Sequence, residues 1–508
     1  MTFTVDFTRR DFSGPLRPAC TFTPERLSWT AFGGCDRAVL HALGASDDLL
    51  TLTALLRCPV MVRDLTAAPV WWGFVEKIEV QLDQVMVTVT MERLFNRVSV
   101  RYSHLSPDNR LAEETITPPA DNLQSQAEYG VKETTISLDG IDDDRALSLR
   151  DTFLSQHAFP LSELSQAPDP QPPHARLFCS GWFNTLSWRT YDFPDGFYAN
   201  YGPGPGVFAF GNASASNLVA QAFHVSSDGL LQYAYFRLRK VGNPTRNLVA
   251  RLYANASSSP GTLLASSQPV PGGSLPPQSY AWFRFAFSTP YPLTAGSTYW
   301  IALSPSGLDP AHFFQVKVDE NCNFNQDGRS AKFWNGAAWS SLPSITAPDT
   351  RPQLYFRVVC ALDTAAQLLS MAAAGGQFLN RITAPAAGRQ TSPFRFSGRT
   401  CLEEAVALLR LGTSNDRLLL AMVTPDRDLH FFEQPDPAQA DIYLDRHSHF
   451  YNNQGINLLS YHPPVGHFAR LSAINTISLP WDRHRLPACF IAGAEYLPAS
   501  DQIIIHAF

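Results

Sequence analysis

The stretch VWWGFVEKIEVQLDQVMVTVTM, residues 70–91, decides the fold class of this chain. From Val85 onward, valines alternate with methionine and threonine, so the two sides of the backbone differ in polarity with a period of two residues. Polar residues around Asp83 separate this arm from the apolar arm before it, which is typical of a tight reversal. We therefore predict a β-hairpin that reverses near Asp83, inside a compact, barrel-like unit over residues 1–105.

The composition extends this prediction to the whole chain. Its 508 residues are enough for about three or four domains. Hydrophobic residues make up 45% and charged residues only 17%, whereas 39 prolines and 30 glycines supply many turns. Because this mixture is typical of short strands joined by turns, we predict a mainly β protein with short helices.

Charge and cysteine content argue against several function classes. The formal net charge is −6 and the basic residues are not clustered, so we expect no nucleic-acid-binding surface. The eight cysteines are scattered without a C-x-x-C pair, which argues against a zinc site and a disulfide framework. We find no apolar signal segment and no stretch long enough to cross a bilayer, and therefore expect assembly in a reducing cytoplasm and release by lysis.

Two proline-rich segments divide the chain. The sequence APDPQPP at 167–173 predicts a rigid, extended linker at a boundary, and YGPGPG at 201–206 predicts a second break. We predict four regions, which are the barrel-like unit over 1–105, a scaffold and linker region over 106–206, an inserted antiparallel β-sandwich (jelly roll) over 207–362, and a second scaffold region over 363–508.

The sandwich prediction depends on closely spaced strand signals. Apolar runs recur at short intervals through 207–362 and are broken by Gly- and Pro-rich turns. Asn335-Gly336 lies between Phe333-Trp334 and Trp339, which is a strong hairpin signal.

Capping signals predict several short helices. We expect Ser46 to cap a helix over 47–56, and three aspartates from Asp142 to begin another. Thr400 and Glu403 have the spacing of a capping box ahead of a helix over 402–411, and a further helix is expected over 364–373. The run GWFNTLSWR at 181–189 is expected to form an aromatic strand of the scaffold.

No catalytic motif is present in the sequence. There is no G-x-S-x-G, no H-E-x-x-H and no phosphate-binding glycine loop. The acid pair Glu403-Glu404 falls in a helical first turn, where capping explains it. We therefore expect no enzyme.

Two segments contain possible metal ligands. His447 and His449 would point the same way in a strand near Asp445 and could suit a metal, but we favour a polar, aromatic-rich loop at a subunit contact. The oxygen-rich loop with Asp319, Glu320 and Asp327 could hold a structural calcium ion, and the alternative is a plain solvated loop.

Aromatic residues of the sandwich are the main ligand-binding candidates. Flat rings stack on the C–H faces of sugars, but most large rings belong in a core. Phe283, Phe285 and Phe287 form one apolar row, so Trp282 falls on the opposite face. Trp334 and Trp339 bracket a hairpin tip. We predict a glycan platform made by Trp334, Trp339 and Trp282.

Several segments of both scaffold halves resemble tail-hub proteins of tailed bacteriophages. In the first half these are LSWTAFGG (27–34), LLRCPV (55–60), VWWGFV (70–75) and LFNRVSV (94–100). In the second half they are Gly398-Arg399-Thr400 with the capped helix and the hairpin at Asp426. The resemblance covers about the first 200 and the last 145 residues. The segment 207–362 resembles jelly-roll modules that phages insert into tail-tip proteins.

The resemblance implies a structural role in the virion. Such hubs are barrel-like subunits that form rings, here expected to be a trimer, under the tail tube around the channel for DNA and the tape measure protein. Expected partners are distal tail and tail-tube proteins, the tape measure protein, other tail-tip proteins and a host-surface glycan, with DNA only as passing cargo. The alternatives are a free cell-surface carbohydrate-binding or adhesin protein, and a hydrolase of envelope polysaccharide.

Overall fold

The computed structural model describes residues 3–105, 111–191, 197–200, 206–213, 217–307, 309–319, 331–343, 352–391, 399–434, 442–444, 468–471, 489–499 and 502–507. The protein is mainly β with short helices, as predicted. It divides into two compact units. The first unit comprises Met1–Tyr191, Met371–Ala387 and Gly398–Phe508, and the second comprises Asp192–Ser370 and Gly388–Ser397.

In the described part of the first unit, fourteen strands form one large mixed sheet. They are β1 (Thr4–Thr8), β2 (Pro15–Leu16), β3 (Thr21–Thr30), β4 (Phe32–Leu43), β5 (Pro59–Arg63), β6 (Pro69–Thr90), β11 (Leu161–Ser180), β26 (Ile382–Thr383), β28 (Leu419–Val423), β29 (Leu429–Glu433), β30 (Ile442–Leu444), β31 (Phe468–Leu471), β32 (Cys489–Leu497) and β33 (Gln502–Ala507).

The predicted hairpin lies within β6. The Met91 amide donates to the Glu76 carbonyl (3.1 Å), fifteen residues back, so the chain reverses between them. Asp83, at the midpoint, has φ 56°, a left-handed conformation that tight hairpin turns require. The reversal near Asp83 is therefore confirmed.

The proline-rich segment 167–173 is not a boundary between units. It lies inside β11, whose residues 161–166 pair with one arm of the β6 hairpin and 174–180 with the other. Prolines favour extended backbone and cannot donate to a ladder, so they suit a span that crosses the hairpin tip without pairing regularly.

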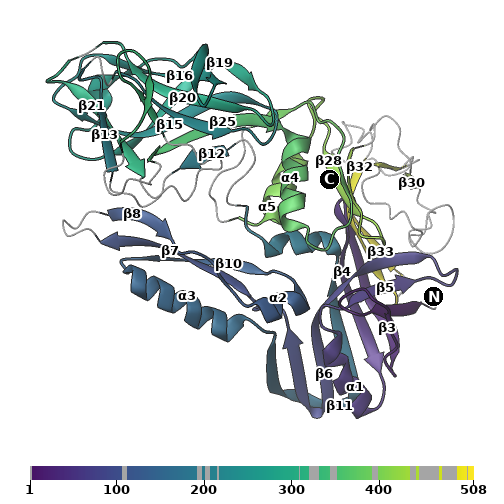
Figure 1. Cartoon of the computed structure of the whole chain (residues 1–508). Coiled ribbons are helices and arrows are strands. Elements are labelled where there is room, and N and C mark those ends of the chain that lie inside the picture. The colour runs from purple at the N-terminus through teal and green to yellow at the C-terminus, as the bar shows by residue number, and fades with distance from the viewer. Residues whose placement is uncertain are drawn as a thin grey trace, which may run out of the picture. The chain divides into compact units, whose positions relative to one another are not determined.

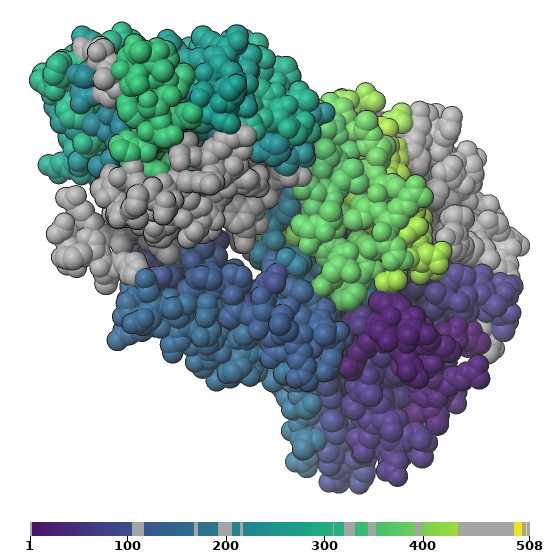
Figure 2. Space-filling view, viewed as in Figure 1, coloured from purple at the N-terminus to yellow at the C-terminus, as the bar shows by residue number. Residues whose placement is uncertain are grey.

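Segments from the two ends of the sequence meet in this sheet (Figure 1). β3 pairs with β32 in antiparallel register, from Leu27 opposite Tyr496 onward, and β28 pairs with β4 in parallel. The indole of Trp72 donates to the Val423 carbonyl (2.9 Å). The guanidinium carbon of Arg427 lies 3.6 Å from the Phe12 ring centroid. In Figure 2, light-green atoms of the C-terminal half adjoin dark-purple N-terminal ones.

A smaller sheet in the first unit is covered by one helix. Its described strands are β7 (Arg97–Leu105), β8 (Leu111–Ile116), β9 (Ala120–Asp121) and β10 (Glu133–Asp139). Helix α3 (Asp143–His157) lies along one face of it and packs Ala146 and Leu149 against Val100 and Tyr102 (Figure 1). Asp142 caps α3 by accepting from the Arg145 amide (2.8 Å), so the predicted helix start is confirmed.

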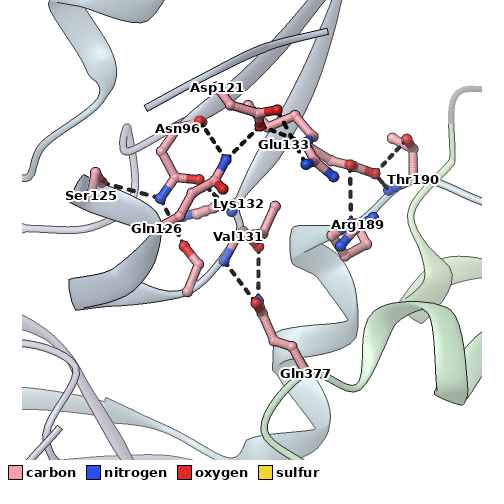
Figure 3. Close-up of polar contacts among 12 residues, drawn as sticks. Asn96, Asp121, Ser125, Gln126, Val131, Lys132, Glu133, Arg189, Thr190 and Gln377 are labelled. Atoms are coloured by element: carbon pink, nitrogen blue, oxygen red, sulfur yellow. Dashed lines mark hydrogen bonds and ion pairs between the residues drawn. The ribbon is translucent and has the colours of Figure 1, made fainter. Parts of the chain in front are cut away.

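A polar network fixes helix α2 (Leu123–Tyr129) beside β7 and β10 (Figure 3). The Asn96 side-chain nitrogen donates to Ser125 Oγ (3.1 Å) and the Gly130 carbonyl (2.7 Å), and the Asn96 side-chain oxygen accepts from the Lys132 backbone amide (2.8 Å). Arg97 donates to both carboxylate oxygens of Asp121. Because the buried Asn96 side chain bonds through both its nitrogen and its oxygen, it fixes three segments at little desolvation cost.

The same network reaches the C-terminal half of the first unit (Figure 3). The Gln377 side chain accepts from the Val131 amide (2.7 Å) and donates to the Val131 carbonyl (2.8 Å), as a neighbouring strand would. Glu133 accepts from Arg189 Nε (3.0 Å) and Thr190 Oγ1 (2.8 Å). Side chains therefore connect segments that are far apart in sequence.

The second unit is an antiparallel β-sandwich. One described sheet has eight strands, β12 (Phe197–Asn200), β13 (Gly206–Phe210), β15 (Gly229–Val241), β19 (Ala281–Leu293), β21 (Phe313–Asp319), β24 (Gln353–Leu354), β25 (Phe356–Asp363) and β27 (Gln390–Thr391). The other has seven, β14 (Val219–His224), β16 (Asn247–Ala256), β17 (Ser259–Ser266), β18 (Val270–Pro271), β20 (Thr298–Pro305), β22 (Lys332–Trp334) and β23 (Trp339–Ser341). Apolar side chains from both sheets form one core.

The sandwich begins earlier in sequence than residue 207. β12 pairs with β25 from Phe197 opposite Val359, and this assigns it to the second unit. The short strand β27 also pairs with β25, through Thr391 opposite Leu362. Such non-local pairing leaves no local sequence signal, which is why turn signals alone placed the edges elsewhere.

The remaining helices are α1 (Ser46–Thr51), η1 (Leu52–Leu55), η2 (Trp182–Trp188), η4 (Gly272–Ser274), α4 (Thr364–Gly375) and α5 (Cys401–Leu411). Ser46 is not a cap, because Ala45 holds that position without a side-chain bond. The aromatic run at 181–189 is a 3-10 helix rather than a strand. There Thr185 Oγ1 bonds the Trp182 carbonyl, a local hydroxyl bond that competes with strand pairing.

Candidate functional site

The outer face of the seven-stranded sheet is separated from the core by strand alternation. On β14, Val219 and Phe223 point into the core, and Ala220 and Ala222 point outward. On β20, Ile301 and Leu303 belong to the core by the same rule. Trp300 and Ala302 therefore belong to the outer face.

Small residues form the floor of this face. Ala220, Ala222, Ala302 and Trp300 are fully buried, although they lie outside the main core. Tyr253 and Trp339 pack over them as half-buried side chains. The Trp300 indole donates to Asn255 Oδ1 (3.0 Å), so this ring is fixed from the edge of the face.

The two tryptophans predicted at the hairpin tip lie together. Trp334 and Trp339 are directly opposite each other in the β22–β23 register, with ring centroids 5.7 Å apart in an edge-to-face arrangement. Trp339 is also edge-to-face with Tyr253, at 6.3 Å. Three half-buried rings therefore form a continuous chain, in which Tyr253 and Trp339 pack over the floor residues.

The turn between these tryptophans is exposed and well defined. Asn335 Oδ1 accepts from the amides of Ala337 (3.0 Å) and Ala338 (2.8 Å), and Gly336 takes φ 96°. The hairpin predicted at Asn335-Gly336 is confirmed, with a longer turn than two residues. This turn therefore places backbone polar groups and the Asn335 side chain beside the rings.

Trp282 belongs to the other sheet and does not join this cluster. Its neighbours Phe285 and Phe287 enter the core, as the alternation predicts, and Trp282 packs under the Arg357 guanidinium at 3.9 Å. Arg284 stacks on Tyr233 in the same way, at 5.1 Å. The three tryptophans therefore lie on two separate surfaces of the sandwich.

The predicted calcium residues are only partly described. Asp319 ends β21 as a fully buried residue opposite Gln353, while Glu320 and Asp327 lie outside the described residues. His447, His449 and Asp445 also lie outside them. Within the described residues, no group of three or more His, Cys, Asp or Glu side chains could hold a metal ion.

The acid pair Glu403-Glu404 is part of a helix cap. Glu403 accepts from the Thr400 amide (2.9 Å), and Thr400 Oγ1 accepts from the Glu403 amide (3.2 Å), which confirms the predicted capping box. Glu404 is buried, and Arg399 Nη1 lies 3.9 Å from its carboxylate.

Sequence reasoning missed a buried arginine in the first unit. Arg57 lines a pocket of about 340 Å³, and burial lowers its pKa to about 10. Its guanidinium stacks between the rings of Phe12 (5.7 Å) and Phe378 (4.9 Å) and donates to the Arg10 and Glu128 carbonyls. Phe12, Arg57 and Arg427 all have φ between 63° and 66°. We interpret this cluster as structural, holding together separate segments of the first unit.

Sequence reasoning also missed Tyr253, Arg251 and Lys332 on the outer face. The signal was present in β16, where Arg251, Tyr253 and Asn255 alternate with Leu252 and small residues. Strand alternation identifies a face, but not which strands lie beside one another.

Comparisons with known proteins place this chain in no family. No family model and no curated protein matches it. Among solved structures, the chain is similar to the mosquito-larvicidal Cry4Aa toxin from Bacillus thuringiensis, with a TM-score of 0.17 and 8% sequence identity. The match covers 59% of this chain and 52% of the toxin, so the chain spans about half of the toxin's length. An infectious bursal disease virus VP2 subviral particle gives TM-score 0.16 and 8% identity, over 68% and 82%. Similarity this low carries no argument. Within the described residues, no helix is long and apolar enough to cross a membrane.

Proposed function

We propose that this chain is a structural, non-enzymatic protein of a tailed-phage tail tip, and that its sandwich contacts a glycan of the host envelope. The chain of rings formed by Tyr253, Trp339 and Trp334 carries the glycan part of the proposal. Half-buried rings held by a rigid sheet provide stacking surface with little conformational entropy to lose on binding.

The exposed turn supports the same proposal. Residues 335–338 are exposed and lie between the two tryptophans, so amide groups adjoin the ring surface. Sugars present apolar C–H faces and hydroxyl edges together, and this combination of rings and amides matches both.

The insertion of the sandwich supports the structural part. The chain leaves the first unit after Tyr191, forms the sandwich, and returns to the first unit to pair β28 with β4 and β32 with β3. A domain inserted between the two halves of one folded unit is what we expect of a hub subunit that presents a binding module. We propose a homotrimeric ring under the tail tube, around the channel for DNA and the tape measure protein.

A glycan array with the purified full chain tests the binding role. We expect Trp339→Ala and Trp334→Ala to reduce binding by about tenfold or more, because each removes one ring of the chain. Trp282→Ala is the matched control, since it removes the same side chain from the other sheet. Equal losses in all three variants, or no loss in the first two, would contradict the assigned face.

The mass of the purified chain in solution tests the assembly. We expect a ring oligomer of three chains, and avidity between its sites of about 10²–10⁴-fold over one site on a multivalent surface. A chain that stays monomeric at high concentration, with electron micrographs of virions that lack it at the tail tip, would refute the structural role.

A further inference from the structure

The two units carry opposite net charge. The second unit contains 13 lysines and arginines against 9 aspartates and glutamates, a formal charge of +4. The first unit contains the remaining 26 basic against 36 acidic residues, a formal charge of −10. The sandwich is therefore basic within an acidic chain, and the overall charge of −6 conceals this difference.

The charges of the seven-stranded sheet are few and of one sign. Its described strands contain two charged residues, Arg251 on β16 and Lys332 on β22, and no aspartate or glutamate. Strand alternation places both on the outer face, because Leu252 and Phe333 beside them pack against the core.

Strand register places these two cations in one row across the face. Arg251 is opposite Ala302, Ala302 is opposite Ala220, and Ala220 is opposite Lys332. Three strand spacings separate the backbones of Arg251 and Lys332, which is roughly 14 Å along the sheet. Each cation is two residues from an end of the ring chain, Arg251 from Tyr253 and Lys332 from Trp334, so one cation lies beside each end of the chain of rings.

Neither cation is neutralised by a described carboxylate. Arg251 Nε is buried without a hydrogen-bond partner in the described part of the chain. Lys332 Nζ donates to a neutral group, Ser259 Oγ (2.8 Å), and lies 5.8 Å from the Trp300 ring centroid. In the first unit, by contrast, Arg97 donates hydrogen bonds to both carboxylate oxygens of Asp121. Half-buried cations without a described counter-ion favour an anionic ligand.

We propose that this face binds an acidic saccharide, with the sugar rings against Trp339 and Trp334 and the anionic groups held by Lys332 and Arg251. This inference rests on the proposed glycan-binding function and specifies its ligand class. The shared chemistry is an anionic oxygen on a saccharide, which a uronic acid carboxylate or a phosphodiester-linked sugar polymer can supply. A guanidinium prefers such planar or tetrahedral oxyanions to a neutral hydroxyl.

Binding of the full chain to four saccharide probes tests the ligand class. The probes are oligogalacturonate, poly(glycerol phosphate), dextran and chitin oligomers, each measured at low and high salt. We expect one or both anionic probes to bind more tightly than the two neutral ones, with affinity falling as salt rises. Comparison of the first two probes distinguishes carboxylate from phosphate.

Charge variants test the residues. We expect Lys332→Gln and Arg251→Gln to weaken binding of the anionic probe by about tenfold each, because each removes a charge-assisted contact. Lys332→Arg and Arg251→Lys should retain most of it, which separates loss of charge from loss of folding. Arg284→Gln, an exposed arginine on the other sheet, is the matched control and should bind normally.

The outcomes separate the two proposals. Tight binding of neutral probes that both Gln variants retain would overturn the acidic-ligand inference and leave the glycan-binding function standing. No binding of any saccharide, here and on the glycan array, would overturn both. Binding of a single-stranded DNA oligomer in preference to every saccharide would also overturn the inference, since it would assign the cations to another class of polyanion.

Discussion

In the first unit, Arg97 pairs with Asp121, Asn96 bonds Ser125 and Lys132, and Gln377 bonds both main-chain groups of Val131. In the sandwich, Arg251 and Lys332 have no described carboxylate partner, and the interior is an apolar core. One unit uses its polar side chains to join segments of its own chain. The other leaves two cations of one outer face without such a partner.

This difference indicates a division of roles. A polar network that is fully bonded fixes one geometry, because each unsatisfied partner would be costly. An apolar core between two sheets supplies most of the packing in the sandwich, so its outer faces can carry groups for a ligand. In the proposed function, the first unit keeps a fixed place in the assembly and the sandwich binds the ligand.

Trp72→Ala should have the largest effect, on the first unit alone. Trp72 is buried and donates to Val423, so the variant creates a cavity and removes a bond between the two halves. We expect a loss of about 3–5 kcal/mol in the free energy of unfolding. Hydrogen exchange should accelerate in β6 and β28 and stay unchanged in β20. Equal acceleration in β20 would mean that the two units unfold together.

Glu133→Gln should have an intermediate effect on the same unit. The substitution removes the charge from a carboxylate that binds Arg189 and Thr190, at a side-chain exposure of 13%. We expect a loss of about 1.5–3 kcal/mol in denaturant unfolding. Glu163→Gln, at an exposed position of β11, is the control and should change stability by about 0.5 kcal/mol or less. A similar loss in the free energy of unfolding in both variants would show that the Glu133 network stabilises the fold no more than an exposed carboxylate does.

Lys132→Met tests the network through pH. Burial lowers the pKa of Lys132 below its ordinary value of 10.5, so the folded state releases this proton before the unfolded state does. The free energy of unfolding of the unsubstituted protein should therefore rise relative to that of Lys132→Met as the pH increases from the lowered pKa towards 10.5. The reason is that folding then no longer buries a charged lysine. Unfolding of both proteins in urea across this pH range measures the difference in their free energies of unfolding. A constant difference between them would show that the lysine is not desolvated.

Lys332→Gln and Arg284→Gln should have the smallest effects on stability. Both cations lie on outer faces of the sandwich, so each substitution should change the free energy of unfolding by about 0.5 kcal/mol or less. Thermal unfolding of the sandwich measures this. A large loss for Lys332→Gln would show that its bond to Ser259 stabilises the fold, and the contrast between the two units would weaken.

Local patterns in the sequence predicted the local structure well. The reversal at Asp83, the capping box at Thr400, the Asn335-Gly336 hairpin and the Phe285 core row need only neighbours within a few residues, and all four are present. Backbone geometry and strand alternation act over that range, so a single sequence contains the information. The mainly β class follows from the same signals.

Only the tertiary structure decided which distant residues meet. It brought Tyr253 to Trp339, Arg251 into one row with Lys332, and Gln377 to Val131, and it placed Trp282 on a different sheet from the other two tryptophans. The proline-rich run at 167–173 became a span inside a strand for the same reason. Pairing between strands far apart in sequence depends on how whole sheets pack. The residues within one strand show which face a side chain takes, but not what lies next to it.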